Sequence, residues 1–319
     1  MKQPGIQKVL RASMRSEGFA GKVYRWASVP TIERRPVSQA ANPSTPLAEI
    51  IMRIIPALQT LVPIASLCAV ATTAVAQSAA NFVDSCQRNR SDNARVCETR
   101  NVAVAASGAL AVDGQQNGGI AVHAWDKGDI QVIAMVQAQA ETEAEAQAIA
   151  RQVTITTTNG TVRATGPQTE KRQSWSVSYE VWAPRATNLG LTAHNGGISV
   201  DGIEANMNLQ TVNGGLDLQD VSGEVHGVTT NGGITAILSG DRWRGNGLDL
   251  RTSNGGVELR IPTNYSATLE TGTVNGDLDI RIPMTVQGLL SRQISTQLGS
   301  GGAIVRAMTT NGGVSIRPR

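Results

Sequence analysis

Three acidic residues, Asp217, Glu258 and Asp279, are the best candidates for catalytic groups in this sequence. Each stands between two apolar residues, so in a strand its side chain would point away from the core. Polysaccharide-cleaving enzymes converge two such carboxyl groups on one face, or combine acids with Ca²⁺ and a basic group. Each of the three also has an ordinary interpretation as a solubilising surface residue. We therefore predict no catalytic residues and no enzymatic activity.

The other residues that could carry chemistry lack the partners that known sites require. The three histidines share no catalytic spacing and no metal-ligand spacing with the cysteines: His123, His194 and His226. The glycine-rich run 299–302 lacks the lysine of a phosphate-binding loop, and the Asn-Gly-Gly segments lack the aspartate of calcium-binding repeats. We predict no metal site and no small-molecule cofactor.

The charge distribution argues against nucleic acid as a partner. The chain has 28 Lys and Arg against 25 Asp and Glu, but the basic excess lies within residues 1–76. Beyond residue 76 acidic residues predominate, and the only lysines are Lys127 and Lys171. A nucleic-acid-binding domain keeps a basic surface on its folded part, so this class of function is excluded.

An uncharged segment, Ile54 to Ala80, contains the small-x-small triplet Ala74-Val75-Ala76. This pattern predicts a signal peptide over residues 52–76, with cleavage leaving Gln77 at the mature N-terminus. Residues 1–51 would then be an upstream extension of the reading frame or a disordered arm. An uncleaved membrane anchor is the alternative, although two prolines interrupt it. We expect an exported protein, located in the periplasm, at the cell surface or outside the cell.

Two cysteines remain once Cys68 is removed with the signal peptide. Cys86 and Cys97 lie close together in a polar stretch, and an even pair in an exported protein predicts a disulfide. We interpret residues 77–98 as a linker that contains this disulfide loop.

A repeat organises the rest of the chain. Eight Asn-Gly dipeptides, which we call marks, follow one another at spacings of 42, 36, 18, 18, 23, 21 and 36 residues, and six of these eight continue as Asn-Gly-Gly. The marks begin at Asn117, Asn159, Asn195, Asn213, Asn231, Asn254, Asn275 and Asn311. Apolar-x-apolar steps follow most of them, as in Leu216-Asp217-Leu218, and this period of two predicts strands with one buried face. We predict structural turns at all eight marks.

The regular spacing favours a coil over a meander of hairpins, although Asn-Gly is also the leading hairpin signal. We predict an all-β fold, a parallel β-solenoid of about ten coils over residues 99–319. The preference of parallel crossovers predicts a right-handed coil. Stacked coils lie ~4.8 Å apart, so the asparagine amides would form a ladder while the glycines supply positive φ angles.

The N-terminal third lacks this regular spacing, and its pattern predicts a cap at the end of the solenoid. Glu141–Arg151 is an alanine-rich helix whose Thr142 and Glu145 have capping-box spacing. Trp175, Val177, Tyr179 and Val181 alternate with polar residues in a two-faced strand. We interpret both elements as the cover of the last apolar coil rather than as a cofactor site. The loop 240–245, Gly-Asp-Arg-Trp-Arg-Gly, is the best local candidate for recognition.

The repeat carries a resemblance to a known family. Thr211-Val212-Asn213-Gly214-Gly215-Leu216 and Thr229-Thr230-Asn231-Gly232-Gly233-Ile234, with the same pattern from Thr309, resemble a bacterial domain of unknown function provisionally described as an adhesin. The resemblance extends from about residue 98 to 319. It implies an exported β-strand-repeat protein and defines no catalytic residue.

These observations lead to one expected function and one alternative. We expect an exported, non-enzymatic β-strand-repeat protein that acts as an adhesin-like or envelope scaffold protein, with a cell-surface glycan or an envelope protein as partner. The alternative is a polysaccharide-binding or polysaccharide-cleaving β-helix protein.

Overall fold

The computed structural model describes residues 68–88, 93–105, 108–284 and 292–319. One of its two compact units contains Ala71–Arg319, and all of the strands belong to this unit. The predicted segment 1–51 and residues 52–67 of the predicted signal peptide lie outside the described residues.

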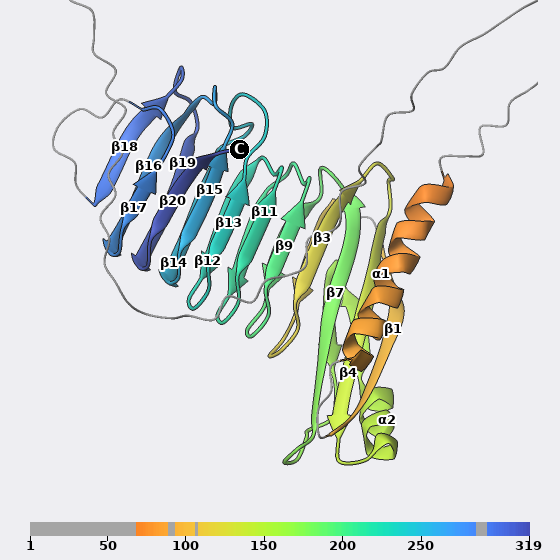
Figure 1. Cartoon of the computed structure of the whole chain (residues 1–319). Helices are drawn as coiled ribbons and strands as arrows, with labels where there is room; N and C mark the ends of the chain where they lie inside the picture. Colours follow the sequence, from red (N-terminus) through yellow and green to blue (C-terminus); the bar gives the residue numbers. More distant parts are fainter. Residues whose placement is uncertain (1–67, 89–92, 106–107, 285–291) are drawn as a thin grey trace, which may run out of the picture. The chain divides into compact units, whose positions relative to one another are not determined.

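Two ten-stranded sheets account for most of the described residues (Figure 1). In spatial order, sheet A contains β1 (Ala94–Val104), β4 (Ile130–Ala140), β7 (Ser174–Pro184), β3 (Ile120–Trp125), β9 (Ile198–Asp201), β11 (Leu216–Gln219), β13 (Ile234–Ile237), β15 (Val257–Ile261), β20 (Val314–Pro318) and β17 (Leu278–Ile280). Sheet B contains β18 (Gln293–Leu298), β16 (Ala267–Asn275), β19 (Ile304–Asn311), β14 (Gly247–Asn254), β12 (Glu224–Thr229), β10 (Met207–Thr211), β8 (Asn188–Thr192), β2 (Ala109–Asp113), β6 (Thr161–Thr165) and β5 (Thr154–Thr158).

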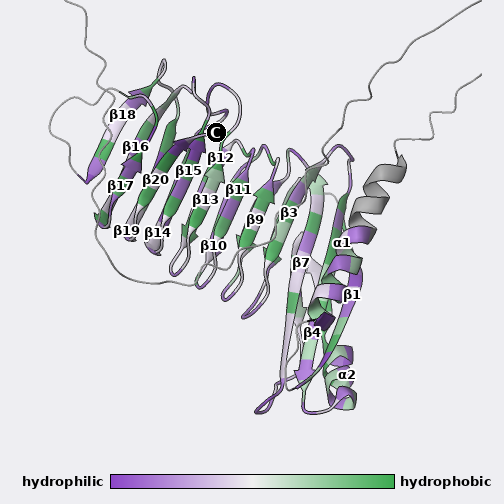
Figure 2. Cartoon of the chain, viewed as in Figure 1, coloured by the Kyte–Doolittle hydropathy of each residue, from purple (hydrophilic) through white to green (hydrophobic). Residues whose placement is uncertain are grey.

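The predicted period of two explains how these strands form. From β8 to β17 the chain alternates between sheet B and sheet A, and the apolar-x-apolar step after every mark except Asn159 becomes a strand of sheet A. Equivalent positions pair in parallel register: Leu216 lies between Ile198 and Ile234. The inward side chains of both sheets form one apolar core, visible as alternating hydrophobic and hydrophilic bands (Figure 2).

The prediction of an all-β fold is confirmed, but both sheets are mixed rather than wholly parallel. The described residues contain eight strand pairs with one strand in each sheet, against the ten coils expected. The difference has two causes. Asn159 marks a hairpin instead of a coil, and the interval between Asn275 and Asn311 contains β18, which pairs antiparallel with β16.

The order of the coils in space departs from their order in the chain. The last strand pair, β19–β20, lies between β14–β15 and β16–β17 in both sheets. Similarly, β6–β7 lies outside β2–β3, although it follows that pair in the chain.

The predicted helix is α2 (Glu143–Gln152), and Thr142 and Glu145 form the expected capping box at its start. Its buried face, which includes Ile149, packs against Ala138 and Ala140 of β4. The aromatic strand is β7, which lies inside sheet A between β4 and β3 rather than at its end. The helix packs on β4 and β1, the antiparallel pair at one end of sheet A.

A second helix, α1 (Cys68–Arg88), was not expected from the sequence. Its residues Ala79 and Phe82 contact an apolar cluster on sheet A, which consists of Trp125, Ile133, Met135 and Trp182. The expected linker 77–98 thus contains part of α1 and the start of β1. None of the described helices combines the length and hydropathy that a membrane crossing requires.

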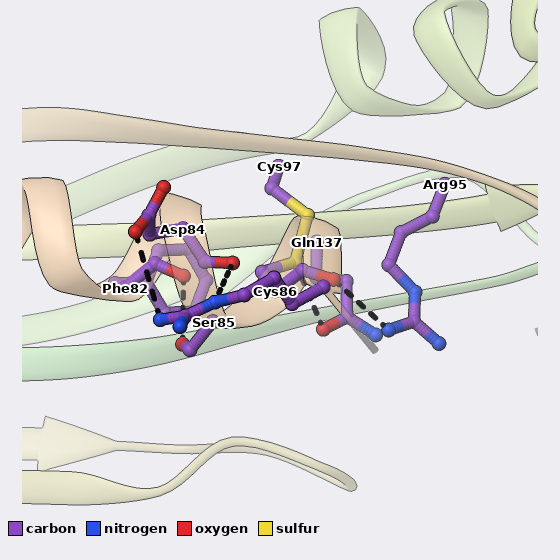
Figure 3. The surroundings of a disulfide bond; sticks show 8 residues. Phe82, Asp84, Ser85, Cys86, Arg95, Cys97 and Gln137 are labelled. Carbon is purple, nitrogen blue, oxygen red and sulfur yellow. Dashed lines mark hydrogen bonds and ion pairs between the residues drawn. A yellow bond between two sulfur atoms is a disulfide. The ribbon is translucent and has the colours of Figure 1, made fainter. Parts of the chain in front are cut away.

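The disulfide expected between Cys86 and Cys97 joins α1 to β1 (Figure 3). Arg95 of β1 also donates a hydrogen bond to the Cys86 carbonyl oxygen at 3.2 Å. The helix is therefore held to the sheet by covalent, polar and apolar contacts.

Candidate functional site

Seven of the eight predicted marks meet in one asparagine ladder. Each side-chain Nδ2 donates to the Oδ1 of the neighbouring asparagine at 2.8–2.9 Å, in the order Asn275, Asn311, Asn254, Asn231, Asn213, Asn195, Asn117. The order follows the sheets rather than the sequence, because Asn311 lies between Asn254 and Asn275. Asn159 is not a rung. It forms the two-residue turn between β5 and β6 with Gly160, and both have positive φ, as that hairpin turn requires.

At six of the seven rungs the following glycine is required for a reason other than the predicted one, and the exception is Gly312, whose φ is 154°. The φ of Gly232 lies outside the left-handed region, so the expected positive φ is wrong there. Instead, a Cβ on Gly232 would lie 2.0 Å from the Gly214 carbonyl oxygen of the neighbouring turn. The glycines let successive backbones approach closely.

A buried threonine two residues before each of five rungs completes the turn. Its hydroxyl donates to the carbonyl oxygen of a glycine in the adjacent turn, at 2.7 Å for Thr229 and Gly214. The equivalent donors are Thr211, Thr252, Thr273 and Thr309. No role was predicted for these threonines, although the repeated Thr-x-Asn-Gly pattern contained the signal. The ladder is therefore a scaffold, in which glycine carbonyl oxygens of one turn accept hydrogen bonds from threonines of the next.

The predicted outward acids lie in one row of sheet A. Register places Thr235 between Asp217 and Glu258, and Ser315 between Glu258 and Asp279. Two of the acids are held by arginines. Arg260 lies 2.8 Å from Glu258, and hydrogen bonds from Arg281 lower the pKa of Asp279.

Asp217 differs from the other acids of the row. Burial raises its pKa, and attraction by Arg260 offsets this in part. For Asp217, burial therefore favours the protonated form.

The three histidines lie in separate places. His123 is 3.3 Å from Glu180, and its ring is tilted by 33° against that of Trp182 with the centroids 5.7 Å apart, while the backbone of His194 bonds neighbouring turns. His226 is 3.3 Å from Glu224. No group of three metal-binding side chains occurs among the residues that the structure describes.

The loop 240–245 does not present its tryptophan for recognition. Trp243 is buried in the core and its indole nitrogen donates to the Gly223 carbonyl oxygen at 3.0 Å. Arg244 pairs with Glu204. Asp241 and Arg242 of the loop are exposed, so a recognition role for the rest of the loop stays a prediction.

The best candidate site is a groove of about 560 Å³ on the outer face of sheet B. Small residues form part of its floor, with Ala111 beside Gly190 in register. Polar residues around it include four asparagines and a hydrogen-bonded Glu–His pair: Asn159, Asn188, Asn206, Asn208, Glu224 and His226. We call this hollow, with its small-residue floor and its polar border, the sheet B groove.

The electrostatics of the groove are acidic but weak. Hydrogen bonds from Asn246 and His226 lower the pKa of Glu224, so this carboxylate is ionised at neutral pH. No lysine or arginine is among the residues that line the groove. Amides and a carboxylate offer both donors and acceptors, while the small apolar floor leaves room for a flat ligand.

Of these residues only Asn159 and His226 were singled out from the sequence, and for other reasons. Gly190, Asn208 and His226 recur at 18 residues, as do Asn188, Asn206 and Glu224. The period that predicted the ladder therefore also contained the two rows of the groove.

Comparison with known proteins gives a family and similar folds. No curated protein matches this chain. Three solved structures that match have provisional descriptions: a cell adhesion protein of Clostridium sporogenes, an adhesin of Bacteroides fragilis and a lipid binding protein of Parabacteroides distasonis. Their identities are 10%, 12% and 12%, with TM-scores of 0.36, 0.32 and 0.29. The matches cover 71%, 70% and 70% of this chain, and 100%, 97% and 96% of those chains. Residues 106–317 match the Toastrack DUF4097 family model, and the chain belongs to that family.

Proposed function

We propose that this chain is an exported, non-enzymatic protein with an adhesin-like role at the cell envelope. In this proposal the sheet B groove binds a neutral, hydroxyl-rich ligand such as a cell-surface glycan. The observation that carries the proposal is the groove itself, a hollow with a small-residue floor and a polar border on an otherwise regular sheet.

The chemistry of the groove supports a neutral sugar over an anionic ligand. Sugar hydroxyls both donate and accept hydrogen bonds, which matches asparagine amides and the Glu224 carboxylate. The apolar face of a sugar ring fits a floor of Ala109, Ala111 and Gly190. An anionic group would face the ionised Glu224 without an arginine or lysine in the lining.

Export is supported by the predicted signal peptide and by the disulfide. Disulfides persist in oxidising compartments, and Cys86 and Cys97 are joined. The alternation of the chain between two sheets supports the solenoid, and right-handed winding remains part of the proposal.

A glycan-binding screen with the exported protein tests the proposal. Gly190→Leu would place a side chain on the floor, because a Cβ there has only Ala111 within 4 Å. We expect at least a tenfold loss of binding, equivalent to about 1.4 kcal/mol, with an unchanged melting temperature. Thr235→Leu, on the outer row of sheet A, is the control and should bind normally. Binding that survives Gly190→Leu would remove the groove from the proposal.

Polysaccharide cleavage is the second candidate, and the acid row of sheet A supports it. Burial raises the pKa of Asp217, which is the direction a general acid needs, and Glu258 lies two strands away, about 9.6 Å by the strand spacing. This separation is near the upper end of the range for inverting glycosidases. Release of reducing ends by the parent protein, abolished in Asp217→Asn, would favour this function. Because Glu258 is paired with Arg260, polysaccharide cleavage is the weaker of the two candidate functions.

A further inference from the structure

The last strand pair occupies a slot between two earlier ones. β19 lies between β14 and β16 in sheet B, and β20 lies between β15 and β17 in sheet A. The chain therefore completes both walls of the slot before it supplies the strands that fill it. Until those strands arrive, the slot is open to any segment with a matching pattern.

The walls and the occupant have matching registers. Leu248, Val305 and Leu269 form one row across β14, β19 and β16, and Asn254, Asn311 and Asn275 form another. In sheet A, Val314 lies between Val257 and Leu278. With β19–β20 withdrawn, β14 could pair with β16 in an unchanged register. Leu248 would then lie beside Leu269, and Asn254 beside Asn275.

The segments that lead into the two walls are already bonded to each other. Arg242, ahead of β14, and Ser266, ahead of β16, form a parallel bridge. The Ser266 amide donates to the Asp241 carbonyl oxygen at 2.7 Å. The slot between β14 and β16 thus begins after this bridge. Direct pairing of β14 with β16 would extend the bridge along both strands.

The inserted coil is joined to β18 by a glycine-rich loop, residues 299–303. Gly299, Gly301 and Gly302 have φ of 54°, 74° and 137°. Glycine adopts such angles and their alternatives at low cost, so the loop can serve as a hinge. Short hinge loops of this kind are where identical elements exchange between copies.

Charge makes the slot selective for this chain's own strand. Arg306 of β19 reaches Asp249 of β14 at 3.2 Å and Glu270 of β16 at 2.6 Å. Direct pairing of β14 with β16 would leave these two carboxylates facing each other without the guanidinium. A strand that fills the slot must therefore bring a cation to this position as well as the apolar row.

We propose that the slot between β14–β15 and β16–β17 is an interaction surface for residues 304–318 of a second copy of this chain. Two copies exchange these segments about the 299–303 hinge and form a dimer in which each slot is filled by the other copy. Because the exchanged segment makes the same contacts in the dimer, protein concentration sets the balance between monomer and dimer.

Cysteine substitutions placed on separate copies of the full chain detect the exchange. Arg251 of β14 and Met308 of β19 are register partners. Copies with Arg251→Cys are mixed at high concentration with copies carrying Met308→Cys, then oxidised. We expect an intermolecular disulfide between positions 251 and 308, mapped by mass spectrometry.

Two controls make the result decisive. Gln210→Cys and Val228→Cys are register partners in β10 and β12, outside the slot, and should not cross-link between copies. A single chain with both Arg251→Cys and Met308→Cys reports that the geometry permits the bond. Cross-linking no greater than that of the β10–β12 pair, under conditions where the single chain cross-links fully, overturns the proposal.

Arg306→Gln tests the role of charge in the same assay. Loss of its two ion pairs weakens the inserted state, so exchange should become on the order of tenfold faster. Arg163→Gln removes an arginine of β6 that is paired with Asp113 of β2, outside the slot, and should leave the rate unchanged. Equal rates for the two variants would contradict the assigned role of Arg306.

Discussion

At the scale of single residues, the ladder distinguishes its interior from its ends. Asn231 donates to Asn213 and accepts from Asn254, whereas the contacts described for Asn275 include one ladder bond, to Asn311. These amides are exposed, so water replaces part of what a substitution removes. We therefore expect a smaller cost than for buried polar groups.

Asn231→Ala should lower the free energy of unfolding by about 1–2 kcal/mol, because two hydrogen bonds of about 1 kcal/mol are lost. Asn275→Ala should cost about half as much. Urea denaturation of both variants beside the parent measures the difference. Equal losses would show that the ladder bonds do not contribute individually.

Gly232→Ala should be far more damaging than Gly233→Ala. The first substitution places a Cβ 2.0 Å from a backbone carbonyl oxygen, and the second places one 3.5 Å from its nearest neighbour. We expect a loss of more than about 3 kcal/mol for Gly232→Ala and under about 1 kcal/mol for Gly233→Ala. Thermal melts compare the two, and a similar shift for both would contradict the close-approach explanation.

At the scale of elements, ion pairs link neighbouring strands of sheet B. Burial of Asp249 raises its pKa, but hydrogen bonds and attraction from Arg251 and Arg306 outweigh this, so its pKa lies below the usual range. A lowered folded-state pKa stabilises the protein above the unfolded value of about 4, and this contribution is lost as pH falls through the folded pKa.

The free energy of unfolding should therefore fall between pH 7 and pH 2, and protonation of Asp249 should contribute to this loss at the acidic end of the range. Asp249→Asn should be less stable than the parent at pH 7, and the gap should narrow below pH 4. Glu258→Gln, on the outer face of sheet A, provides the comparison. A constant gap between Asp249→Asn and the parent would exclude the titration of Asp249 as the cause.

The disulfide acts on α1 rather than on the coils. Removing it with Cys86→Ser and Cys97→Ser releases a loop whose ends are 11 residues apart, a loss of up to about 3 kcal/mol in the chain-entropy account. We expect faster hydrogen exchange in α1 and a red-shifted tryptophan emission as Phe82 leaves Trp125 and Trp182. Unchanged exchange throughout α1 would show that its apolar contacts suffice.

At the scale of the whole molecule, the predicted cleavage leaves a useful part of α1 in place. A mature chain that begins at Gln77 keeps Ser78, Ala79 and Phe82, which contact the outer face of sheet A. N-terminal sequencing of exported protein should therefore find Gln77 first. Finding residues 1–51 still attached would contradict both the cleavage and a translation start at Met52.

Local pattern predicted much of the fold. The period of two identified the strands of sheet A, and the Asn-Gly spacing identified seven rungs of the ladder. Thr142 and Glu145 marked the start of α2. These features depend on neighbours in the chain, or on a period that places equivalent residues in one column.

The order of the coils could not be predicted in this way. β14, β16 and β19 all end in Thr-x-Asn, so each can neighbour any other in the same register. The charge row of Asp249, Arg306 and Glu270 distinguishes the observed order, but only after the register is known. Asn159 was misassigned because a hairpin turn and a coil turn share the Asn-Gly signature.

The asparagine ladder also has a direction. Every rung except Asn117 donates its Nδ2 toward Asn117, and every rung except Asn275 accepts on the side of Asn275, so the carboxamide dipoles point the same way. Rotating one amide by half a turn would set donor against donor on one side and acceptor against acceptor on the other. The row can reverse only as a unit, and polarisation along it strengthens each bond. Side-chain amide protons should consequently exchange with solvent most slowly at the centre of the row and fastest at its two ends.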